Sequence, residues 1–421
     1  MAEAMLAPDI DDMFDIEEDA RRNGSGVIDD PYPLWAEMLR QAPVHEGPLA
    51  GLMGRPLDAG VMYHPGPKYF SVMSFQGVSE VFTRKDDFDS GFYRDTGTFT
   101  DAILGMDGLK HRRFRDVIQV WFQPDKASSW WRDKVIAPLV DELVGAFDAA
   151  PGVDLNAQLF ARLPMRTATE GFGLTPEEGL DFRRFLLGAM SSEATPQQKG
   201  AAMQAANAIL DRVIRERQAA PQDDIISRLV ETEFEDEDGT RRKLTIDEVA
   251  SYCRLIVFAG GGTTWKQLGI TAFALLNNPD QLEAVRADRS LLPKAILESA
   301  RWYPNDPMFP RQAKRNTVLE GVEIPAGSVM HLCLGSANRD PSRWERPDLF
   351  DIFRPVQRSV AFAAGAHSCL GQHVAREEML GALNALLDRF PNIRWDPAYP
   401  PARLSGSLLS RGPGPLHVLL R

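Results

Sequence analysis

The chain has 421 residues, 44% of them hydrophobic, and a formal net charge of -12 at pH 7. This length and composition allow a sizeable core in one large domain or two, and the acidic balance disfavours general binding to nucleic acid. The 3 cysteines, Cys253, Cys333 and Cys369, are too few and too widely spaced for a disulfide framework, which is typical of a reducing cytosol.

The N-terminal segment MAEAMLAPDIDDMFDIEEDARRNGSG is acidic and has no basic stretch followed by an apolar run, so it lacks the pattern of a signal peptide. No segment approaches the ~18 uninterrupted apolar residues of a membrane span. We therefore expect a cytoplasmic protein without membrane partners. Residues 1–25 are expected to form a flexible lead-in.

Strand-like segments are short. Alternating apolar residues predict a strand in KYFSVMSF at 68–75. Two strands are predicted within 317–334, around Gly321 and a turn at 325–327, and a last strand is predicted at 415–420.

Helical periodicity dominates the rest of the chain and predicts a mainly α fold. Residues 129–150 and 195–218 have the spacing of amphipathic helices. The acidic segment ETEFEDEDGTRRK at 231–243 is expected to be a charged, solvated loop.

The longest predicted helix begins at Thr245, which has the capping-box spacing to Glu248, and ends before Asn278 and Pro279. It spans roughly 30 residues, which is long for a globular protein. It is apolar on most faces, so it should run through the core. Three consecutive glycines at 260–262 lie near its middle, although each costs about 1 kcal/mol in a helix interior.

The lysine that follows these glycines does not make them a phosphate-binding loop. Such a loop has the pattern Gly-x-x-x-x-Gly-Lys-Ser/Thr directly after a strand. Here Trp265 precedes Lys266, Gln267 follows it, and the preceding residues have a helical pattern.

A second informative segment, at 359–390, places Cys369 in a glycine-rich loop directly before an amphipathic helix. The positive end of the helix dipole and its free N–H groups would stabilise a thiolate there. Gly371 would let the backbone approach the sulfur closely, and Phe362 would shield it from water. Cys253 and Cys333 lack this context and are predicted to be inert core thiols.

A zinc site formed by His367, Cys369 and His373 is an alternative interpretation of the same segment. Structural zinc usually requires four ligands, commonly in paired sets of Cys and His. The chain contains no second pair, which weakens this alternative.

The segment FAAGAHSCLG at 362–371 resembles the haem-binding signature of cytochromes P450. The matching positions are Phe362, Gly365, His367, Cys369 and Gly371. Ala363 departs from the pattern, because the family more often has Gly or Ser there. Further segments follow the family's order: GLKHRRFR with His111 and Arg115, FAGGGTTW in the long helix, ESAR with Glu298 and Arg301, and DIFRP with Arg354.

The resemblance implies a mainly α protein with small β-sheets at one side, in which residues 26–421 form a single domain that binds haem b. Cys369 would be the axial ligand of the haem iron. The residues implied to bind the haem propionates are His111, Arg115, Arg311 and His367. The residues implied to form a buried ion network, which fixes the cysteine loop, are Glu298, Arg301 and Arg354.

The resemblance also assigns the glycine-rich helix to the oxygen side of the haem. Ala259, Gly260 and Gly261 would leave a groove over the iron and allow the helix to bulge, although close helix packing is an alternative. Thr263 would face this groove. The family normally has Asp or Glu before that threonine, but this chain has Gly262, so water or a polar group of the substrate would relay protons.

The position of the substrate pocket is implied by the family as well. The candidate lining residues are Phe92, Tyr93, Phe99, Phe258, Met308, Phe309 and Leu408. This set implies a small hydrophobic organic substrate and offers no cationic anchor for a carboxylate.

The implied activity is that of a bacterial, class I type monooxygenase, which uses O2 and electrons from a separate ferredoxin and its NAD(P)H reductase. Lys110, Arg112 and Arg113 would form a basic patch for that partner, or else a simple solvated turn. A monomer is expected. The alternatives are a peroxide-using or non-oxygenating haem-thiolate enzyme, which Gly262 favours, and a haem-binding sensor without catalysis.

Overall fold

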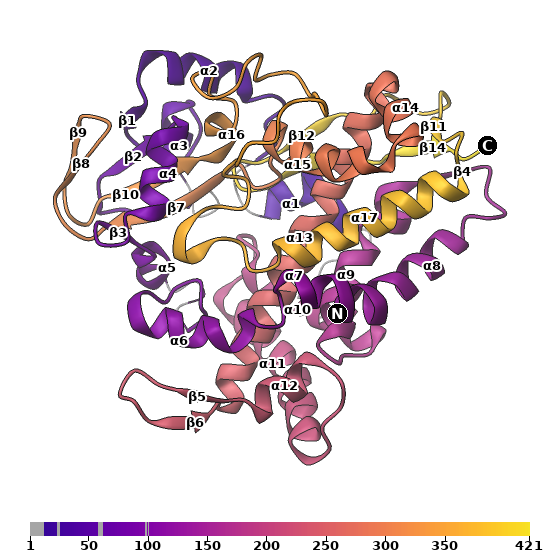
Figure 1. Ribbon diagram of the computed structural model, residues 1–421. Helices are drawn as coiled ribbons and strands as arrows, with labels where there is room; N and C mark the ends of the chain where they lie inside the picture. Colours follow the sequence, from indigo (N-terminus) through magenta and orange to yellow (C-terminus); the bar gives the residue numbers. More distant parts are fainter. Residues whose placement is uncertain (1–11, 23–25, 58–61, 97–98, 100) are drawn as a thin grey trace.

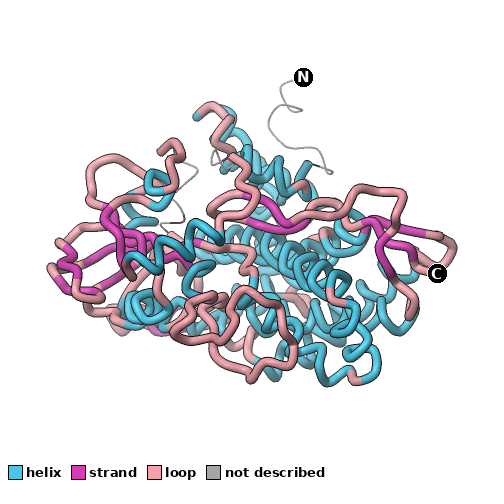
Figure 2. Tube along the Cα trace, turned by 90° about the horizontal axis from the view of Figure 1, so that it is seen from above, coloured by secondary structure: helices cyan, strands magenta, loops and turns pink. Residues whose placement is uncertain are grey.

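The computed structural model describes residues 12–421 except 23–25, 58–61, 97–98 and 100 (Figure 1). Helices form most of the molecule, and the long helix α13 runs through its centre. Figure 2 shows the strands gathered toward two opposite ends of the molecule, with helices between them. The predicted mainly α class is confirmed, but the small sheets are not confined to one side.

The helices cover most of the described chain, and none among these residues is long and apolar enough to cross a membrane. The α-helices are α1 (Ile16–Arg22), α2 (Tyr32–Gln41), α3 (Leu49–Leu52), α4 (Phe75–Thr83), α5 (Gly91–Asp95), α6 (Gly108–Gln119), α7 (Pro124–Lys126), α8 (Ala137–Gly145), α9 (Arg162–Gly171), α10 (Pro176–Met190), α11 (Pro196–Ala219), α12 (Ile225–Glu231), α13 (Ile246–Asn277), α14 (Pro279–Ala287), α15 (Leu292–Trp302), α16 (Leu334–Ala337) and α17 (Gln372–Arg389). Shorter or wider helical segments are η2 (Asp12–Phe14), η4 (Ala127–Ile136), η5 (Asn156–Phe160), η6 (Arg289–Leu291) and η7 (Gly365–His367).

The largest sheet has five strands in the order β1-β2-β10-β7-β3, and a second sheet has the order β11-β14-β4. Three hairpins complete the strands: β5-β6, β8-β9 and β12-β13. The bounds are β1 (Val44–Glu46), β2 (Tyr69–Val72), β3 (Phe88–Asp89), β4 (Gly152–Asp154), β5 (Glu233–Glu235), β6 (Arg241–Lys243), β7 (Met308–Ala313), β8 (Thr317–Leu319), β9 (Val322–Ile324), β10 (Val329–Cys333), β11 (Arg394–Trp395), β12 (Leu404–Gly406), β13 (Arg411–Pro413) and β14 (His417–Leu419).

The predicted long helix is α13, and its capping box is present. The hydroxyl of Thr245 accepts a 3.2 Å hydrogen bond from the N–H of Glu248, whose carboxylate accepts a 2.8 Å bond from the N–H of Thr245. The helix continues for 32 residues and ends at the predicted Asn278–Pro279 boundary. It is α-helical along its whole described length, so the bulge expected at the glycines is absent.

The N-terminal segment differs from its prediction. The expected flexible lead-in is wrong for residues 12–22, whereas residues 1–11 and 23–25 lie outside the described residues. Ile16 and Ala20 of α1 are buried, because their spacing places them on one helix face. Asp19 of α1 accepts a 2.6 Å hydrogen bond from Lys266 of α13, which ties this segment to the core.

Three further segments refine the sequence prediction. The segment 317–334 contains three strands rather than two, because β8 and β9 pair across Glu320 and Gly321, both of which have positive φ. The third strand, β10, is buried between β2 and β7. The charged segment 231–243 contains the β5-β6 hairpin rather than only a loop.

Candidate functional site

Cys369 lies in the loop directly before α17, next to η7. Its backbone N–H donates a 2.9 Å hydrogen bond to the carbonyl of Phe362, which closes the loop. Gly365 has a φ of +71°, and a Cβ there would collide with the carbonyl oxygen of Phe82, so only glycine fits. Ala363 has a φ of 55°, a left-handed conformation that glycine adopts with less strain.

The environment of Cys369 contains groups that stabilise a thiolate. Cys369 has solvent-accessible surface, but protein atoms surround its thiol, and the resulting desolvation raises the pKa of the thiol. The N–H groups of Gly371 and Gln372, and the guanidinium of Arg115, oppose that rise. A Cβ on Gly371 would meet no described atom within 4 Å, so packing within the described chain does not explain this glycine.

The four predicted propionate ligands lie together beside this loop. The ring of His111, which is 3% exposed, contacts the ring of His367 in a tilted arrangement, with centroids 4.1 Å apart and an interplanar angle of 36°. Arg115 donates a 2.7 Å hydrogen bond to the carbonyl of Ser368, the residue before the cysteine. Arg311 is buried and lies close enough to both histidines to lower their pKa values.

This cluster has more basic groups than carboxylates. Burial, followed by repulsion from His367 and Arg115, lowers the pKa of His111 to about 3. The buried Nε2 of His111 has no hydrogen-bond partner in the described structure. Among the described residues, Asp107 alone forms an ion pair with the cluster, at 3.4 Å from His367. The two carboxylates of a haem would supply the missing charge and hydrogen-bond acceptors, so these residues fit that group.

Glu298, Arg301 and Arg354 form a buried ion network. Arg301 donates to both carboxylate oxygens of Glu298 at 2.8 and 2.7 Å, and Arg354 lies 3.3 Å from the same carboxylate. The remaining N–H groups of Arg301 donate to backbone carbonyls, including that of Asn338. The side chain of Asn338 accepts a 2.8 Å hydrogen bond from the N–H of Val360, so the network extends to the start of the cysteine loop.

The glycine run of α13 has two kinds of surroundings. Ala259 is exposed, and the hydroxyl of Thr263 donates a 2.9 Å hydrogen bond to its carbonyl. A Cβ on Gly260 would lie 3.6 Å from the side chain of Ala168 in α9. Gly261 is buried, whereas Gly262 is half-buried. Close packing therefore explains Gly261, whereas a Cβ at Gly260 would make only an ordinary contact with Ala168. Ala259, Gly262 and Thr263 lie on the more open face.

Sequence analysis missed three ionisable side chains around this helix, of which Arg183 and Glu378 are buried and Asp306 is half-buried. Arg183 of α10 lies against the glycine run. Burial raises the pKa of Asp306, between α15 and β7, to about 6. Burial also raises the pKa of Glu378 in α17 to about 8, although the hydroxyls of Thr264 and Thr167 lie beside it.

The predicted substrate-pocket residues differ in their burial and surroundings. The rings of Phe99 and Phe258 contact each other with centroids 5.5 Å apart, and both side chains are half-buried. Phe309 is half-buried against the five-stranded sheet. Four of the predicted residues are buried within core clusters, and their role in a substrate pocket stays a prediction: Phe92, Tyr93, Met308 and Leu408.

The zinc interpretation is not supported. Within the described residues, no three His, Cys, Asp or Glu side chains converge on a point that could hold a metal ion. The ring of His367 instead contacts that of His111, and its Nε2 faces Asp107.

The predicted basic patch is smaller than expected. Lys110 and Arg112 of α6 are exposed. Arg113 forms an ion pair with Glu235 of the β5-β6 hairpin, so its charge is not available to a partner.

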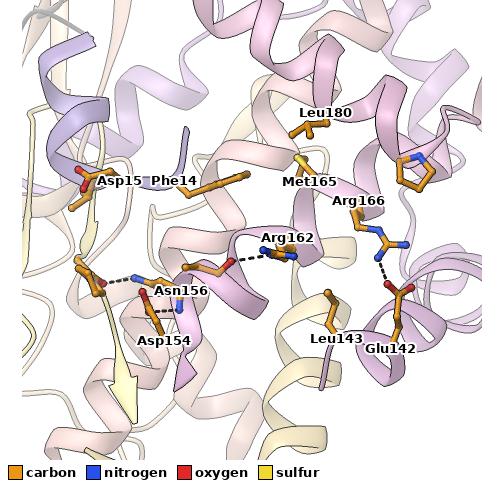
Figure 3. Close-up of a pocket in the computed structure, with 15 residues that line it drawn as sticks. Phe14, Asp15, Glu142, Leu143, Asp154, Asn156, Arg162, Met165, Arg166 and Leu180 are labelled. Carbon is orange, nitrogen blue, oxygen red and sulfur yellow. Dashed lines mark hydrogen bonds and ion pairs between the residues drawn. The ribbon is translucent and has the colours of Figure 1, made fainter. Parts of the chain in front are cut away.

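A separate pocket of about 470 Å³ lies between η2, α8, α9 and α10 (Figure 3). It contains none of the predicted site residues, and the ion pair between Arg166 and Glu142 lies at its edge. Two of its lining residues, Phe14 and Met165, also lie next to Arg183 and Gly261. The pocket and the glycine run are therefore separated by a shared wall.

Comparison with known proteins agrees with this geometry. The family model described as Cytochrome P450 matches residues 183–415. The cytochrome P450 monooxygenase PikC of Streptomyces venezuelae is 30% identical over 387 residues, which cover 89% of this chain and 87% of that protein. The C-19 steroid 1alpha-hydroxylase of Sorangium cellulosum (strain So ce56) is 30% identical over 350 residues, with 78% and 86% covered. The crystal structure of CYP109E1 from Bacillus megaterium in complex with corticosterone is 27% identical, with a TM-score of 0.78, and the match covers 93% of this chain and 98% of that one. The chain therefore belongs to the cytochrome P450 family of haem b-containing monooxygenases.

Proposed function

We propose that this P450 inserts one atom of O2 into a C–H bond of a small, largely apolar organic substrate. The other oxygen atom leaves as water, so each turnover consumes two electrons and two protons. A separate ferredoxin and its NAD(P)H reductase supply the electrons. The observation that carries the proposal is the cluster of four basic side chains beside Cys369, whose thiol faces N–H groups at the start of α17.

In this proposal Cys369 ligates the haem iron as a thiolate. The bound haem supplies the oxidative chemistry. The N–H groups of Gly371 and Gln372 and the guanidinium of Arg115 hold the negative charge on the sulfur. The side chains that bind the propionates are His111, Arg115, Arg311 and His367. Phe362 and Gly365 shape the cysteine loop, and Ala259 leaves space on the opposite side.

Thr263 and Gly262 govern proton delivery. The hydroxyl of Thr263 donates to the carbonyl of Ala259, so its oxygen is left to accept a hydrogen bond from water. Gly262 provides no acid, so protons arrive through ordered water or through a polar group of the substrate. The missing acid favours one second candidate, a peroxide-using enzyme, because peroxide already carries the protons and electrons that O2 requires.

The ferredoxin docks near α6 in this proposal. The exposed Lys110 and Arg112 provide positive charge on an acidic protein, which attracts an acidic partner. We expect Arg112→Glu to slow reduction by ferredoxin and to leave reduction by dithionite unchanged. Equal ferredoxin kinetics in the variant and the wild type would exclude this docking surface.

The spectrum of the reduced, carbon monoxide-bound protein tests the proposal. A strongly red-shifted Soret band that disappears in Cys369→Ser supports thiolate ligation. A band at the shorter wavelength typical of imidazole ligation, in freshly prepared protein, contradicts it. Turnover with NADH and redox partners, compared with turnover in hydrogen peroxide, then separates the monooxygenase from the peroxide-using enzyme.

A further inference from the structure

Among the described residues, Arg183 of α10 is a buried cation without an ion-pair partner. Its side chain is 4% exposed, and its Nε and Nη1 atoms have no hydrogen-bond partner among the described residues. Asp19 is the described carboxylate that influences it, but Asp19 is already paired with Lys266 at 2.6 Å. Burial lowers the pKa of Arg183 to about 10, so the guanidinium remains charged at neutral pH.

The glycine run gives this guanidinium its place. A Cβ on Gly261 would lie 2.9 Å from Nη1 of Arg183, which is too close for any other residue without a shift of the arginine. A Cβ on Gly262 would lie 3.5 Å from Nη2. The guanidinium therefore spans both glycines, with Nη1 on the packed side of α13 and Nη2 on the side of Gly262.

The Gly262 side is also the open side of the helix. In an α-helix, residue 262 is offset by about 60° from residue 259 and by about 100° from residue 263. Nη2 of Arg183 thus lies at the border between the packed side of α13 and the face that carries Ala259. The other sides are closed, because the ring of Phe14 lies 5.7 Å from the guanidinium and the backbone of Met165 packs on Gly261.

We infer that Arg183 anchors the carboxylate of an otherwise apolar substrate at the open face of α13. Guanidinium groups bind carboxylates through two parallel hydrogen bonds, and arginine cannot lose its charge to relieve its burial. This inference rests on the proposed function and differs from the expectation that the pocket has no cationic anchor.

The same helix offers contact for the apolar part of such a substrate. Phe258 lies one turn before Gly262, so the two positions share a helix face. The ring of Phe258 is half-buried and contacts Phe99. An apolar chain that extends from Arg183 along this face would meet both rings.

Spectral titration of the haem-loaded protein tests the anchor, with dodecanoate and dodecan-1-ol as a matched pair of probes. We expect the wild type to bind dodecanoate about tenfold more tightly than the alcohol, because charge-assisted hydrogen bonds exceed neutral ones. Arg183→Gln should remove this preference. Arg184→Gln, at the neighbouring position of α10, should keep it.

A second pair of variants tests the same contact from α13. Gly262→Asp would place a carboxylate beside Nη2 of Arg183, so it should compete with the substrate and abolish the preference for dodecanoate. Gly262→Asn has nearly the same size without the charge and should retain more of the preference. This pair carries the test if Arg183→Gln fails to bind haem.

Three results would overturn the inference. Equal binding of both probes by the wild type is one, and a preference that survives both Arg183→Gln and Gly262→Asp is another. The third result combines two observations: acetate raises the melting temperature of the wild type but not that of Arg183→Gln, and the wild type does not prefer dodecanoate. Arg183 would then bind a free anion and not the carboxylate of an apolar substrate. The reduced, carbon monoxide-bound spectrum separates these results from failure of the proposed function. If the proposed function is wrong, the wild type itself shows no red-shifted band.

Discussion

Arg301 and Arg183 are both buried, with 3% and 4% exposure, but their surroundings are opposite. Arg301 donates to both oxygens of Glu298 and to three backbone carbonyls. Arg183 has two buried nitrogen atoms without a hydrogen bond in the described structure. A buried charge is tolerated when partners replace its hydration. The hydrogen-bond donors of Arg301 are therefore satisfied within the protein. In our proposal, those of Arg183 are satisfied by the carboxylate of a bound substrate.

Glu378 shows why this difference is specific to arginine. It is buried like the two arginines, and no cation contributes to its pKa, which burial raises to about 8. A carboxyl group in such a place takes up a proton and becomes neutral. Arginine has no equivalent escape at physiological pH, so an unpaired Arg183 is a stronger indication of a binding site than an unpaired Glu378.

The largest expected effect on stability comes from removing the charge that pairs with Arg301. Glu298→Gln keeps the size of the side chain but leaves Arg301 and Arg354 without a counter-charge, and we expect it to cost about 3–5 kcal/mol of unfolding free energy. Urea unfolding of the haem-loaded protein measures this loss. Glu283→Gln is the matched control, since Glu283 pairs with Arg286 at the same helical spacing but is 65% exposed, and it should cost less than about 1 kcal/mol. Similar losses in the two variants would mean that burial does not strengthen the network.

Glu378 predicts a pH dependence of smaller size. Its folded-state pKa of about 8 lies above the ordinary value of 4.5, so its neutral form stabilises the fold fully below that value. This contribution is lost as the pH rises toward 8, at about 1.4 kcal/mol per pH unit, because the unfolded carboxyl ionises first. Between pH 5 and pH 7.5 we expect the wild type to lose about 3 kcal/mol relative to Glu378→Gln. Urea unfolding at several pH values measures it, with Glu377→Gln as the control, and parallel curves for wild type and Glu378→Gln would contradict the neutral carboxyl.

Local spacing explains which features the sequence predicts well. The capping box of Thr245 and Glu248 and the end of α13 depend on residues a few positions apart, and both are where the pattern indicates. The resemblance also assigns His111 and His367 to one site, and their rings are in contact although 256 positions separate them. In these cases the residues of the motif are sufficient to predict the local structure or the site.

The missed features depend on contacts between distant elements. Arg183 lies in an ordinary helical pattern, and only the packing of α10 on α13 places it against Gly261. The pairing of Arg113 with Glu235 requires a hairpin that the charged sequence disguises. Burial of α1 likewise depends on the match between Asp19 and Lys266, since short helices are not stable by themselves.

Replacement of Arg183 is expected to change the unfolding free energy in the opposite direction from replacement of Arg301. Arg183→Met keeps a long side chain and removes the unpaired charge, and we expect it to raise the unfolding free energy by about 1–2 kcal/mol in the absence of substrate. Arg301→Met, the control, should lower it by several kcal/mol because it leaves Glu298 unpaired. Thermal unfolding of the haem-loaded proteins compares the two. A loss of stability in Arg183→Met comparable to that in Arg301→Met would show that Arg183 has a structural partner in the folded protein.

The smallest expected effect on stability concerns the backbone of the cysteine loop. Ala363 has a φ of 55°, so Ala363→Gly should relieve left-handed strain and stabilise the fold by about 1 kcal/mol. Ala364 has an extended φ of -149° and is the matched control, because Ala364→Gly relieves no strain and should destabilise the protein. Melting temperatures of the two variants provide the test, and stabilisation by neither would mean that the loop does not store strain at position 363. Stabilisation by Ala363→Gly alone would show that the chain retains backbone strain six residues before Cys369.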